Sequence, residues 1–544
     1  MMFEKFFNRK KHNQKQEETD SSQNKLTIEI QNTEKDTIEQ QEKQSKLPSK
    51  ETTEQIGPPL STSLISNLDY IQQNYKDCCD LVVKKFIINN TDIECALVYF
   101  EADADVDPIQ NVLLTSVLHE YNSRDEITGV NQIKERILPI CDVKDITDEN
   151  TVHQCLLSGN LVLFINGSTT PLFINSKNVI GRSVSTPTME NVVFGAKEAF
   201  VENIRINTVL IRQRMRNQHL KIEEFQLGQD SVTTVRLYYL DNRVDTKVLA
   251  DVQKRIRQLQ PTVISSASTF MGALIDKPFS NVELYENSEK PDVVVNKLNE
   301  GKFAILIDGF PISVMGPTTF FELFNDIEDY SFNTFFASFV RMLRYLAFLL
   351  SLLLAPLYIA LTTFHPEMIP TSLYINLAAQ RADVPFPTIV EIILMLITFE
   401  LIRESSIRLP QYISGTVSIV GALAIGQGVV MVGLVTTNAL IIVAFTALTS
   451  FVFPTYKVSY PLLVNRYLLL FLSTMYGFYG IIIGLFFLIA HLSSIKSFGL
   501  PYLSGFSPLY KKALTDTFLR VPIKYLRPKL PYQSNKQGGK HNDD

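Results

Sequence analysis

The chain contains few cysteines, and none of them is spaced like a metal-binding or redox motif. The five cysteines show no CxxC spacing and all lie before residue 156: Cys78, Cys79, Cys95, Cys141 and Cys155. This pattern argues against both a disulfide framework and a zinc site. We therefore expect reduced core thiols in a cytosolic compartment and no bound metal.

The sequence motifs of common enzymes are also absent. No P-loop, HExxH, protein-kinase, nucleophile-elbow or GxGxxG context is present, and the seven histidines are scattered. We therefore expect no catalytic residues, no enzyme activity and no cofactor. The net charge of −5 gives no indication of nucleic-acid binding.

The first 60 residues lack the groups that build a folded core. Residues 8–60 contain no aromatic residue and are rich in Gln, Glu, Lys, Asn, Ser and Thr. Such a segment cannot bury enough apolar surface to offset its chain entropy. No apolar stretch or cleavage site of a secretory signal peptide is present. We expect residues 1–60 to form a disordered polar tail on the cytosolic side.

Long apolar stretches are missing before Arg341 but abundant after it. A helix needs roughly 20 apolar residues to cross the hydrocarbon core of a bilayer, and four or five such stretches lie between Arg341 and His491. We expect a membrane domain over 339–492, preceded by a soluble part. The predicted spans are 342–364, 413–435, 436–454 and 467–491.

Charge places both ends of the chain on the cytosolic side. The residues after Ser493 carry nine Lys and Arg against three Asp, and Arg341 and Arg344 flank the first span. By the positive-inside rule, the region 493–544 is a basic cytosolic tail. Two ends on one side of the membrane require an even number of crossings.

The soluble part contains an internal repeat. The segment from Gly159 to Gly167 (GNLVLFING) recurs from Gly301 to Gly309 (GKFAILIDG), 142 residues later. Upstream, 97–101 (LVYFE) resembles 237–241 (LYYLD), 140 residues later. Two matches in the same order, at nearly equal offsets, indicate two tandem copies of one unit.

Each copy has the pattern of an α/β subdomain. An apolar run, an Asn-Gly or Asp-Gly turn and a second apolar run predict a hairpin in each copy. We expect the turn glycines Gly167 and Gly309 to adopt a positive φ. The predicted fold class is a tandem-repeat α/β cytosolic region, with similar subdomains over 64–182 and 232–330, followed by an all-α polytopic membrane domain.

The residues between the two subdomains, 183–231, are predicted to form a linker helix. Thr186 can cap this helix, Pro187 suits its first position, and Glu190 favours the positive end of its dipole. The helix would run to about Gln218. Its arginines form a solvated face or, alternatively, a docking surface for lipid headgroups or neighbouring subunits: Arg205, Arg212, Arg214 and Arg216.

One membrane segment, 387–408, is unusually charged. Glu391 stands among apolar residues, and four further charges are spaced for pairing along a helix: Glu400, Arg403, Glu404 and Arg408. A carboxylate at membrane depth normally faces protein or water and marks an ion or proton path. An interfacial helix would instead keep these charges in water. The requirement for an even number of crossings favours a re-entrant or interfacial segment, although a sixth membrane segment would also give an even number.

The predicted span 413–435 has two contrasting faces. Small residues spaced by four permit close helix packing: Ser418, Ala422 and Gly426. The opposite face combines polar and apolar side chains, as a hydrophobic gate would: Thr416, Val420, Leu423 and Gln427. We predict that the first set packs on neighbouring helices and that the second lines a pore. The alternative is ordinary packing in a helical bundle.

Several segments resemble the A subunit of the GerA-type spore germinant receptors. The resemblance covers about residues 65 to 530 and excludes the N-terminal tail. It rests on 181–191 (GRSVSTPTMEN), 203–207 (NIRIN), 385–391 (PFPTIVE), 400–404 (ELIRE) and 415–428.

This resemblance implies a subunit in the inner membrane of bacterial spores. It implies a complex with a transporter-like B subunit and a lipoprotein C subunit, which responds to nutrients and then releases ions. This subunit would be a homo-oligomeric, nutrient-gated ion channel surrounded by membrane lipid. The alternative function is a non-conducting scaffold or signalling subunit that relays ligand binding by a partner subunit.

Overall fold

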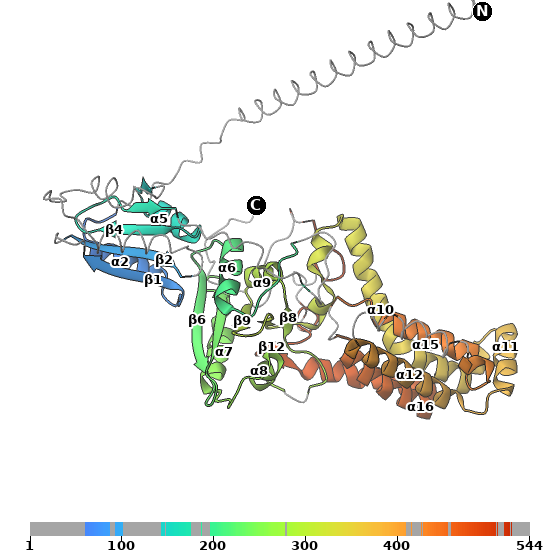
Figure 1. The fold of residues 1–544 in the computed structure, drawn as a ribbon. Helices are drawn as coiled ribbons and strands as arrows, with labels where there is room; N and C mark the ends of the chain where they lie inside the picture. The colour runs from blue at the N-terminus through green and yellow to red at the C-terminus, as the bar shows by residue number, and fades with distance from the viewer. Residues whose placement is uncertain are drawn as a thin grey trace, which may run out of the picture. The chain divides into compact units, whose positions relative to one another are not determined.

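The computed structural model describes two sheet-containing subdomains and a bundle of helices (Figure 1). The predicted N-terminal tail lies outside the described residues. The described residues are 60–87, 93–101, 143–146, 148–175, 187, 196–277, 280–409, 415, 426, 428–454, 458–507, 509, 516–522 and 524.

The first subdomain is an antiparallel sheet of five strands. Its strand order is β1-β2-β4-β5-β3. Helices α2 and α5 pack on the buried apolar side chains of β2 and β4. The elements are α2 (Leu64–Asn74), β1 (Leu81–Ile87), β2 (Glu94–Phe100), β3 (Val143–Asp145), α5 (Glu149–Leu157), β4 (Leu161–Ile165) and β5 (Leu172–Ile174).

The second subdomain is an antiparallel five-stranded sheet with helices on both faces. Its strand order is β6-β7-β9-β10-β8. Successive side chains of a strand point to opposite faces. Leu237 and Ile305 therefore pack with α7 and α8, whereas Tyr238 and Ala304 pack with α6 and α9. The elements are α6 (Ile204–Arg214), β6 (Leu220–Leu227), β7 (Thr233–Leu240), α7 (Thr246–Gln258), α8 (Ala267–Leu274), β8 (Glu286–Ser288), α9 (Pro291–Asn299), β9 (Phe303–Ile307) and β10 (Ser313–Gly316).

The two sheets match strand for strand, which confirms the predicted repeat. Leu97 pairs with Leu163 in the first sheet, and the equivalent Leu237 pairs with Ile305 in the second. The sequence pattern did not include the first helix and strand of each copy in the repeat: α2, β1 and β6 were not predicted, and α6 was predicted only as part of the linker helix. Because β6 lies within the predicted linker, the second copy begins earlier in the chain than 232.

The Asn-Gly and Asp-Gly turns close the predicted hairpins, and both glycines have positive φ. The angle is +86° at Gly167 and +85° at Gly309. Each turn also holds the start of its copy's first helix. The N–H of Gly309 donates to the carbonyl of Glu202 (2.8 Å), and the Asp308 carboxylate accepts from the N–H of Ile204 (3.1 Å). Gly167 and Asn166 make the equivalent contacts with Thr62 and Leu64.

The predicted uninterrupted linker helix is wrong. Residues 196–203 are not helical, and α6 begins at Ile204. The reason is a second capping residue, because the Asn203 side chain accepts from the N–H of Arg205 and the Asn203 backbone is extended. The predicted cap at Thr186 lies outside the described residues.

A buried ion pair joins α6 to the first subdomain. Arg212 donates to the Asp80 carboxylate, with 2.8 Å between Nη2 and Oδ1, and both side chains are almost fully buried. The guanidinium lies 4.0 Å from the Phe100 ring. Backbone pairing extends this contact, since the N–H of Cys79 donates to the carbonyl of Ile222 on β6 (2.9 Å). Arg212 therefore belongs neither to a solvated face nor to a free docking surface.

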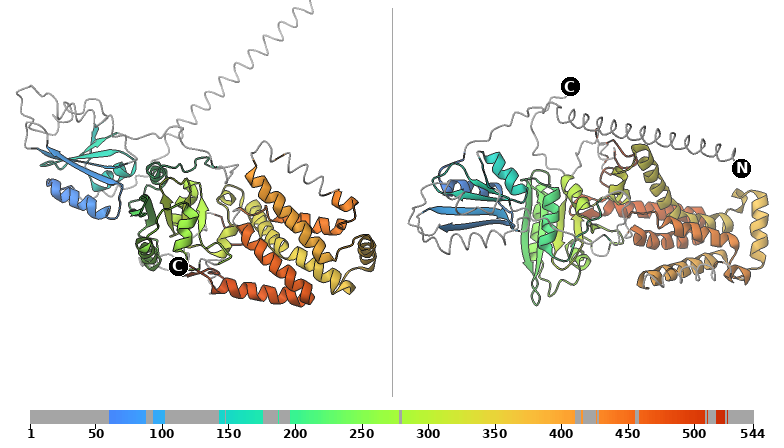
Figure 2. Two further views of the ribbon diagram at one scale, coloured as in Figure 1. Left: turned by 60° about the horizontal axis from the view of Figure 1, so that its bottom comes forward. Right: turned by 45° about the horizontal axis from the view of Figure 1, so that its top comes forward.

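The helical bundle follows the second subdomain. Helices α10, α12, α15 and α16 lie side by side, in Figure 1 and in both views of Figure 2. The elements are η2 (Phe320–Phe324), η3 (Ile327–Tyr330), α10 (Thr334–Thr363), η4 (Pro366–Met368), α11 (Thr371–Ala382), α12 (Thr388–Arg408), α14 (Val429–Met431), α15 (Thr437–Thr449) and α16 (Ser459–Ser494).

Within the described parts of the chain, α10 and α16 are the two helices long and apolar enough to cross a bilayer. Helix α10 contains nearly all of the predicted span 342–364. Helix α15 occupies the predicted span 436–454, but its 13 residues fall short of the roughly 20 that a crossing needs. The predicted span 413–435 lies largely outside the described residues.

Helix α16 reverses direction at Gly477, so the predicted single span 467–491 is wrong. Gly477 has a non-helical φ of 58° and ψ of −132°. Asn465 and His491 both hydrogen-bond to Asn281, whereas a straight helix would hold them about 39 Å apart. We call residues 459–476 the first arm and residues 478–494 the second arm.

Glycine makes this reversal possible. Only glycine adopts the Gly477 backbone conformation without strain. Gly480 and Gly484 of the second arm lie directly against Leu472 and Leu469 of the first, where a Cβ atom would clash. At 1.5 Å per residue, each arm is about 26 Å long, close to the roughly 30 Å of a hydrocarbon core.

After α16 the chain returns to the second subdomain. The short strands β11 (Lys496–Ser497) and β12 (Leu500–Pro501) pair with each other, and Phe498 between them is only 2% exposed. Its ring packs edge-on against Phe303, with 5.0 Å between the centroids, inside the core beneath α7 and α8. The predicted basic tail is therefore, at its start, part of the second subdomain's core.

Replacing the turn glycines tests the repeat. Gly309→Ala and Gly167→Ala are each expected to lower the free energy of unfolding by about 1–2 kcal/mol, because an L-residue is strained at these φ values. Valine should destabilise more. The matched control is Gly272→Ala within α8, where open space surrounds the site and helix propensity favours alanine. Thermal unfolding of the detergent-solubilised chain measures this, and wild-type stability of Gly309→Ala would contradict the assignment.

Candidate functional site

The first feature of the bundle is a buried charged cluster at the start of α10. The Asp329 carboxylate accepts from Arg341 Nε (2.8 Å) and Arg344 Nη1 (2.8 Å). Arg341 is 0% exposed and Asp329 is 1% exposed. The sequence predicts these arginines as flanking charges of a span. The structure instead places them in ion pairs that fix the short helix η3 against α10.

A segment near the C-terminus completes this cluster. Arg341 Nη1 donates to the backbone carbonyl of Asp516 (2.6 Å), and the Asp516 carboxylate accepts from the Tyr330 hydroxyl. Arg520 donates to the carbonyl of Phe332 (2.6 Å). Burial, with the nearby Asp516 charge, raises the pKa of Tyr330 to about 12. Residues 516–520 are thus bound to the N-terminal end of α10.

A second network links the second subdomain to the residues just before the bundle. Lys302, at the start of β9, is 0% exposed, and its Nζ lies 2.7 Å from Glu322 Oε2 and 3.7 Å from Glu286 Oε2. Glu322 also accepts from the N–H of Thr319 and so caps η2. Burial opposes ionisation of Glu322, but the Lys302 and Lys297 charges outweigh it and lower its pKa to about 2. The bundle therefore begins from a fixed point on the sheet.

Glu391 is buried at the junction of two bundle helices. Glu391 is 1% exposed, and its carboxylate accepts from the N–H of Thr436. The hydroxyl of Thr436 in turn caps α15 by accepting from the N–H of Ala439. A carboxylate is stabilised there by the positive end of the helix dipole. This partner gives Glu391 a structural role, and its predicted place on an ion path stays a prediction.

The charges at the end of α12 pair as their spacing predicts. Glu400 lies 2.5 Å from Arg403, and Glu404 lies 2.6 Å from Arg408. Glu400 has a further partner in Arg466 of α16 (3.2 Å), which is 3% exposed. No sequence pattern indicates this contact, because its two residues lie 66 positions apart.

The predicted pore-lining residues lie outside the described residues, as do two of the three packing candidates. These are Thr416, Val420, Leu423, Gln427, Ser418 and Ala422. Gly426 is described, and no described atom lies within 4 Å of the position that a Cβ would take. The pore and packing assignments stay predictions.

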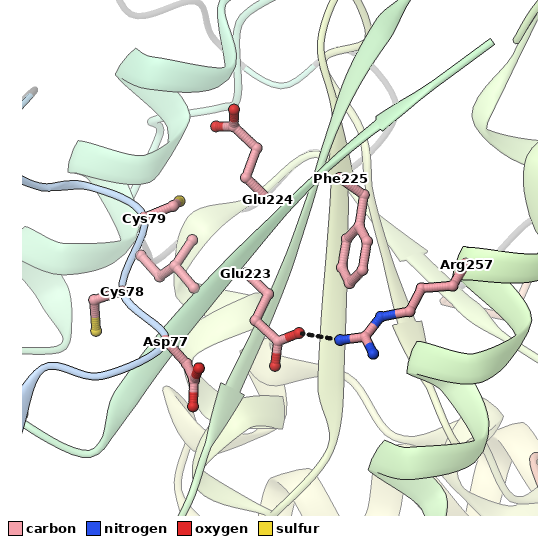
Figure 3. A pocket seen from close by; sticks show the side chains of 8 residues that line it. Asp77, Cys78, Cys79, Glu223, Glu224, Phe225 and Arg257 are labelled. Carbon is pink, nitrogen blue, oxygen red and sulfur yellow. Dashed lines mark ion pairs between the residues drawn. The ribbon is translucent and has the colours of Figure 1, made fainter. Parts of the chain in front are cut away.

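A surface cavity of about 460 Å³ lies where the first subdomain meets β6 (Figure 3). Glu223 and Arg257 face each other across part of it, 4.0 Å apart. No sequence motif indicates a site at this place. Its lining residues are Asp77, Cys78, Cys79, Ile222, Glu223, Glu224, Phe225 and Arg257.

The cysteines among the described residues are all free thiols. Cys95 is buried as predicted, whereas Cys79 is exposed at the edge of this cavity. Cys79 is therefore not a core thiol. Its backbone pairs with β6, which leaves its side chain outside the sheet. Cys141 lies outside the described residues.

Comparisons with known proteins agree on one family. The family described as "Bacillus/Clostridium GerA spore germination protein" matches residues 69–530. Among similar proteins of Bacillus subtilis (strain 168), "Uncharacterized membrane protein YfkQ" is 34% identical, over 91% of this chain and 96% of that protein. "Spore germination protein KA" is 33% identical over 85% of each chain, and "Spore germination protein A1" is 32% identical over 84% of this chain and 94% of that one.

A solved structure is also similar. The crystal structure of the N-terminal domain of the A subunit of the Bacillus megaterium spore germinant receptor GerK3 is 26% identical, with a TM-score of 0.39. It covers 48% of this chain and 98% of that one.

The Lys302–Glu322 pair predicts a pH-dependent effect on stability. Glu322→Gln should destabilise the protein by about 3 kcal/mol at neutral pH, because it leaves Lys302 buried without its closest charged partner. A carboxylate whose pKa is lower in the folded than in the unfolded state stabilises the fold above the unfolded value. The wild-type advantage should therefore shrink as the pH falls from about 4.5 toward about 2.

Denaturant unfolding of the purified chain at several pH values measures this difference. The exposed Glu202 provides the control, since Glu202→Gln should change stability little at any of these pH values. A difference between wild type and Glu322→Gln that stays constant down to pH 2 would contradict the role of this pair.

Proposed function

Because the chain belongs to the Bacillus/Clostridium GerA spore germination protein family, we propose that it is the membrane subunit of a nutrient receptor that triggers spore germination. The observation that carries this proposal is the extent of the match, which runs through the soluble subdomains and the bundle alike. A chain similar only in its soluble part would not require a membrane role. Its relatives are named as spore germination proteins, so the proposal includes no enzyme activity.

The proposed partners are a transporter-like B subunit and a lipoprotein C subunit in the inner membrane of the spore. Within this complex, the nutrient is proposed to bind to a partner, and this chain responds. The buried contacts in this region support such a relay. Lys302–Glu322 fixes η2 to the second subdomain, and Arg344 of α10 donates to the carbonyl of Phe324 in η2, so a shift of the sheet is passed to the start of α10.

We propose a multi-pass topology with both termini in the cytoplasm. The start of α10 and the end of α16 are both attached to the second subdomain, which supports an even number of crossings. Helix α12, with 21 residues, is about 32 Å long. That length favours the six-segment alternative, in which α12 crosses fully, each arm of α16 crosses once, and α15 crosses together with the rest of the predicted span 436–454.

Single cysteines at Ser22 and Ser534 test this topology. In intact cells, both should resist an impermeant thiol reagent, and both should react once the membrane is permeabilised. A cysteine at Leu373 of the exposed helix α11 serves as the control that should react from outside. Labelling of either terminal site in intact cells would overturn the proposed orientation.

For the mode of action, we propose an oligomeric, nutrient-gated ion channel. Thr416, Val420, Leu423 and Gln427 would face its axis, and Ser418, Ala422 and Gly426 would pack between helices. A ring of identical copies makes a central pore geometrically natural. The competing function is a non-conducting scaffold, and counting the subunits of the purified complex separates the two, because a monomer favours the scaffold.

Ion flux from vesicles that contain the complex tests the channel. Val420→Ser or Leu423→Ser should leak ions without nutrient, because a polar constriction admits water. Gly426→Leu should block assembly. Glu391→Gln should assemble normally, because its amide oxygen can still accept from Thr436, yet conduct less. A leaky Ser418 variant beside silent Val420 and Leu423 variants would reverse the assigned faces, and wild-type gating in all of them would favour the scaffold.

A further inference from the structure

One side chain of the second subdomain binds both arms of α16. Asn281 lies in the loop between α8 and β8. Its Nδ2 donates to Asn465 Oδ1 on the first arm (3.2 Å), and its Oδ1 accepts from His491 Nε2 on the second arm (3.1 Å). A single amide therefore bridges the two arms at the end opposite to Gly477.

The second arm has a further, much firmer attachment. Directly after it, the Ser497 hydroxyl donates to the carbonyl of Leu284 (2.7 Å) and accepts from the N–H of Thr318 (3.0 Å). Phe498 then enters the core, and Gly316 makes room for it, since a Cβ there would lie 3.0 Å from the Phe498 ring. The end of the second arm must therefore move with the second subdomain.

The first arm is held to the second subdomain more loosely, although Arg466 joins it to Glu400 of α12. Besides the Asn281 bond, it meets the second subdomain through an apolar cluster that includes Leu284, Val458 and Leu462. A cavity of about 30 Å³ lies in this same seam, lined by Val282, Phe320, Leu462 and Leu488 among others. Because protein interiors are otherwise close-packed, this is where the first arm can shift with little loss of contact.

We propose that Asn281 is a latch that keeps the two arms of α16 together at their open end, and that movement of the second subdomain releases the first arm. The second arm follows the sheet through Phe498, whereas the first arm follows only while the latch is closed. The state of the soluble region thereby sets the spacing of the arms within the membrane. This inference rests on the proposed receptor function and names the element that carries its signal.

Spin labels can measure the arm spacing in the full-length protein. Cysteines at Val464 on the first arm and Ile489 on the second are suitable, because both side chains are exposed and contribute to no buried cluster among the described residues. With the native thiols replaced, electron–electron double resonance in lipid nanodiscs gives the distribution of distances between the two labels.

Asn281→Ala should shift this distribution to longer distances or add a second, longer population. Asn281→Asp should give an intermediate shift, because its carboxylate still accepts from His491 but cannot donate to Asn465, whose own Nδ2 already donates to the Pro461 carbonyl. The control Asn296→Ala removes an exposed side chain of α9 and should change nothing. Phe498→Leu, which keeps an apolar anchor, should leave the distribution nearly unchanged.

An Asn281→Ala distribution identical to that of the parent would overturn the latch. A wider distribution with an unchanged nutrient response of spores that carry Asn281→Ala would overturn its role in signalling. Both results are distinct from failure of the proposed function, which would appear as an unchanged nutrient response in spores from which the wild-type gene has been deleted.

Discussion

The attachment of the bundle to one small sheet is the constraint on which the rest of this structure depends. Lys302 and Glu322 fix the chain just before α10, and Phe498 fixes it just after α16. At the start of α10, Arg341 and Arg344 can be buried because both form ion pairs with Asp329 in place of contacts with water. Removing the aspartate or the arginines would leave a buried charge without its partner. These ion pairs are therefore stable only when both partners are present.

The two copies of the repeat share a fold but differ in what they contact. Their sheets and capping turns are equivalent, yet in the described part of the chain only the second copy is joined to the bundle. The Arg212–Asp80 pair shows where they diverged, since the repeat places Gln72 and His219 at the equivalent positions. A duplicated fold thus acquired two different faces through a few charged or aromatic substitutions on an unchanged framework.

Sequence patterns predicted those features whose determinants are local. The Asn-Gly and Asp-Gly turns, the repeat and the Glu400–Arg403 pair each depend on residues a few positions apart. The patterns failed where a distant or competing residue decided. Asn203 begins α6 within the predicted linker helix, Arg466 reaches Glu400 from another helix, and Gly477 turns an apolar run that looks like a single span. The length of an apolar run shows how many residues can lie in the bilayer, but it does not show whether the chain turns back within that run.

The position of Phe498 affects when the second subdomain can finish folding during synthesis of the chain. A ribosome makes the chain from the N-terminus, and domains generally fold as they emerge. The first subdomain can complete its core early. The core of the second subdomain contains Phe498, so it stays unfinished until every bundle helix has been synthesised. Folding of the second subdomain can therefore finish only after the bundle has been made, and a chain that ends before Phe498 would lack a side chain of this core.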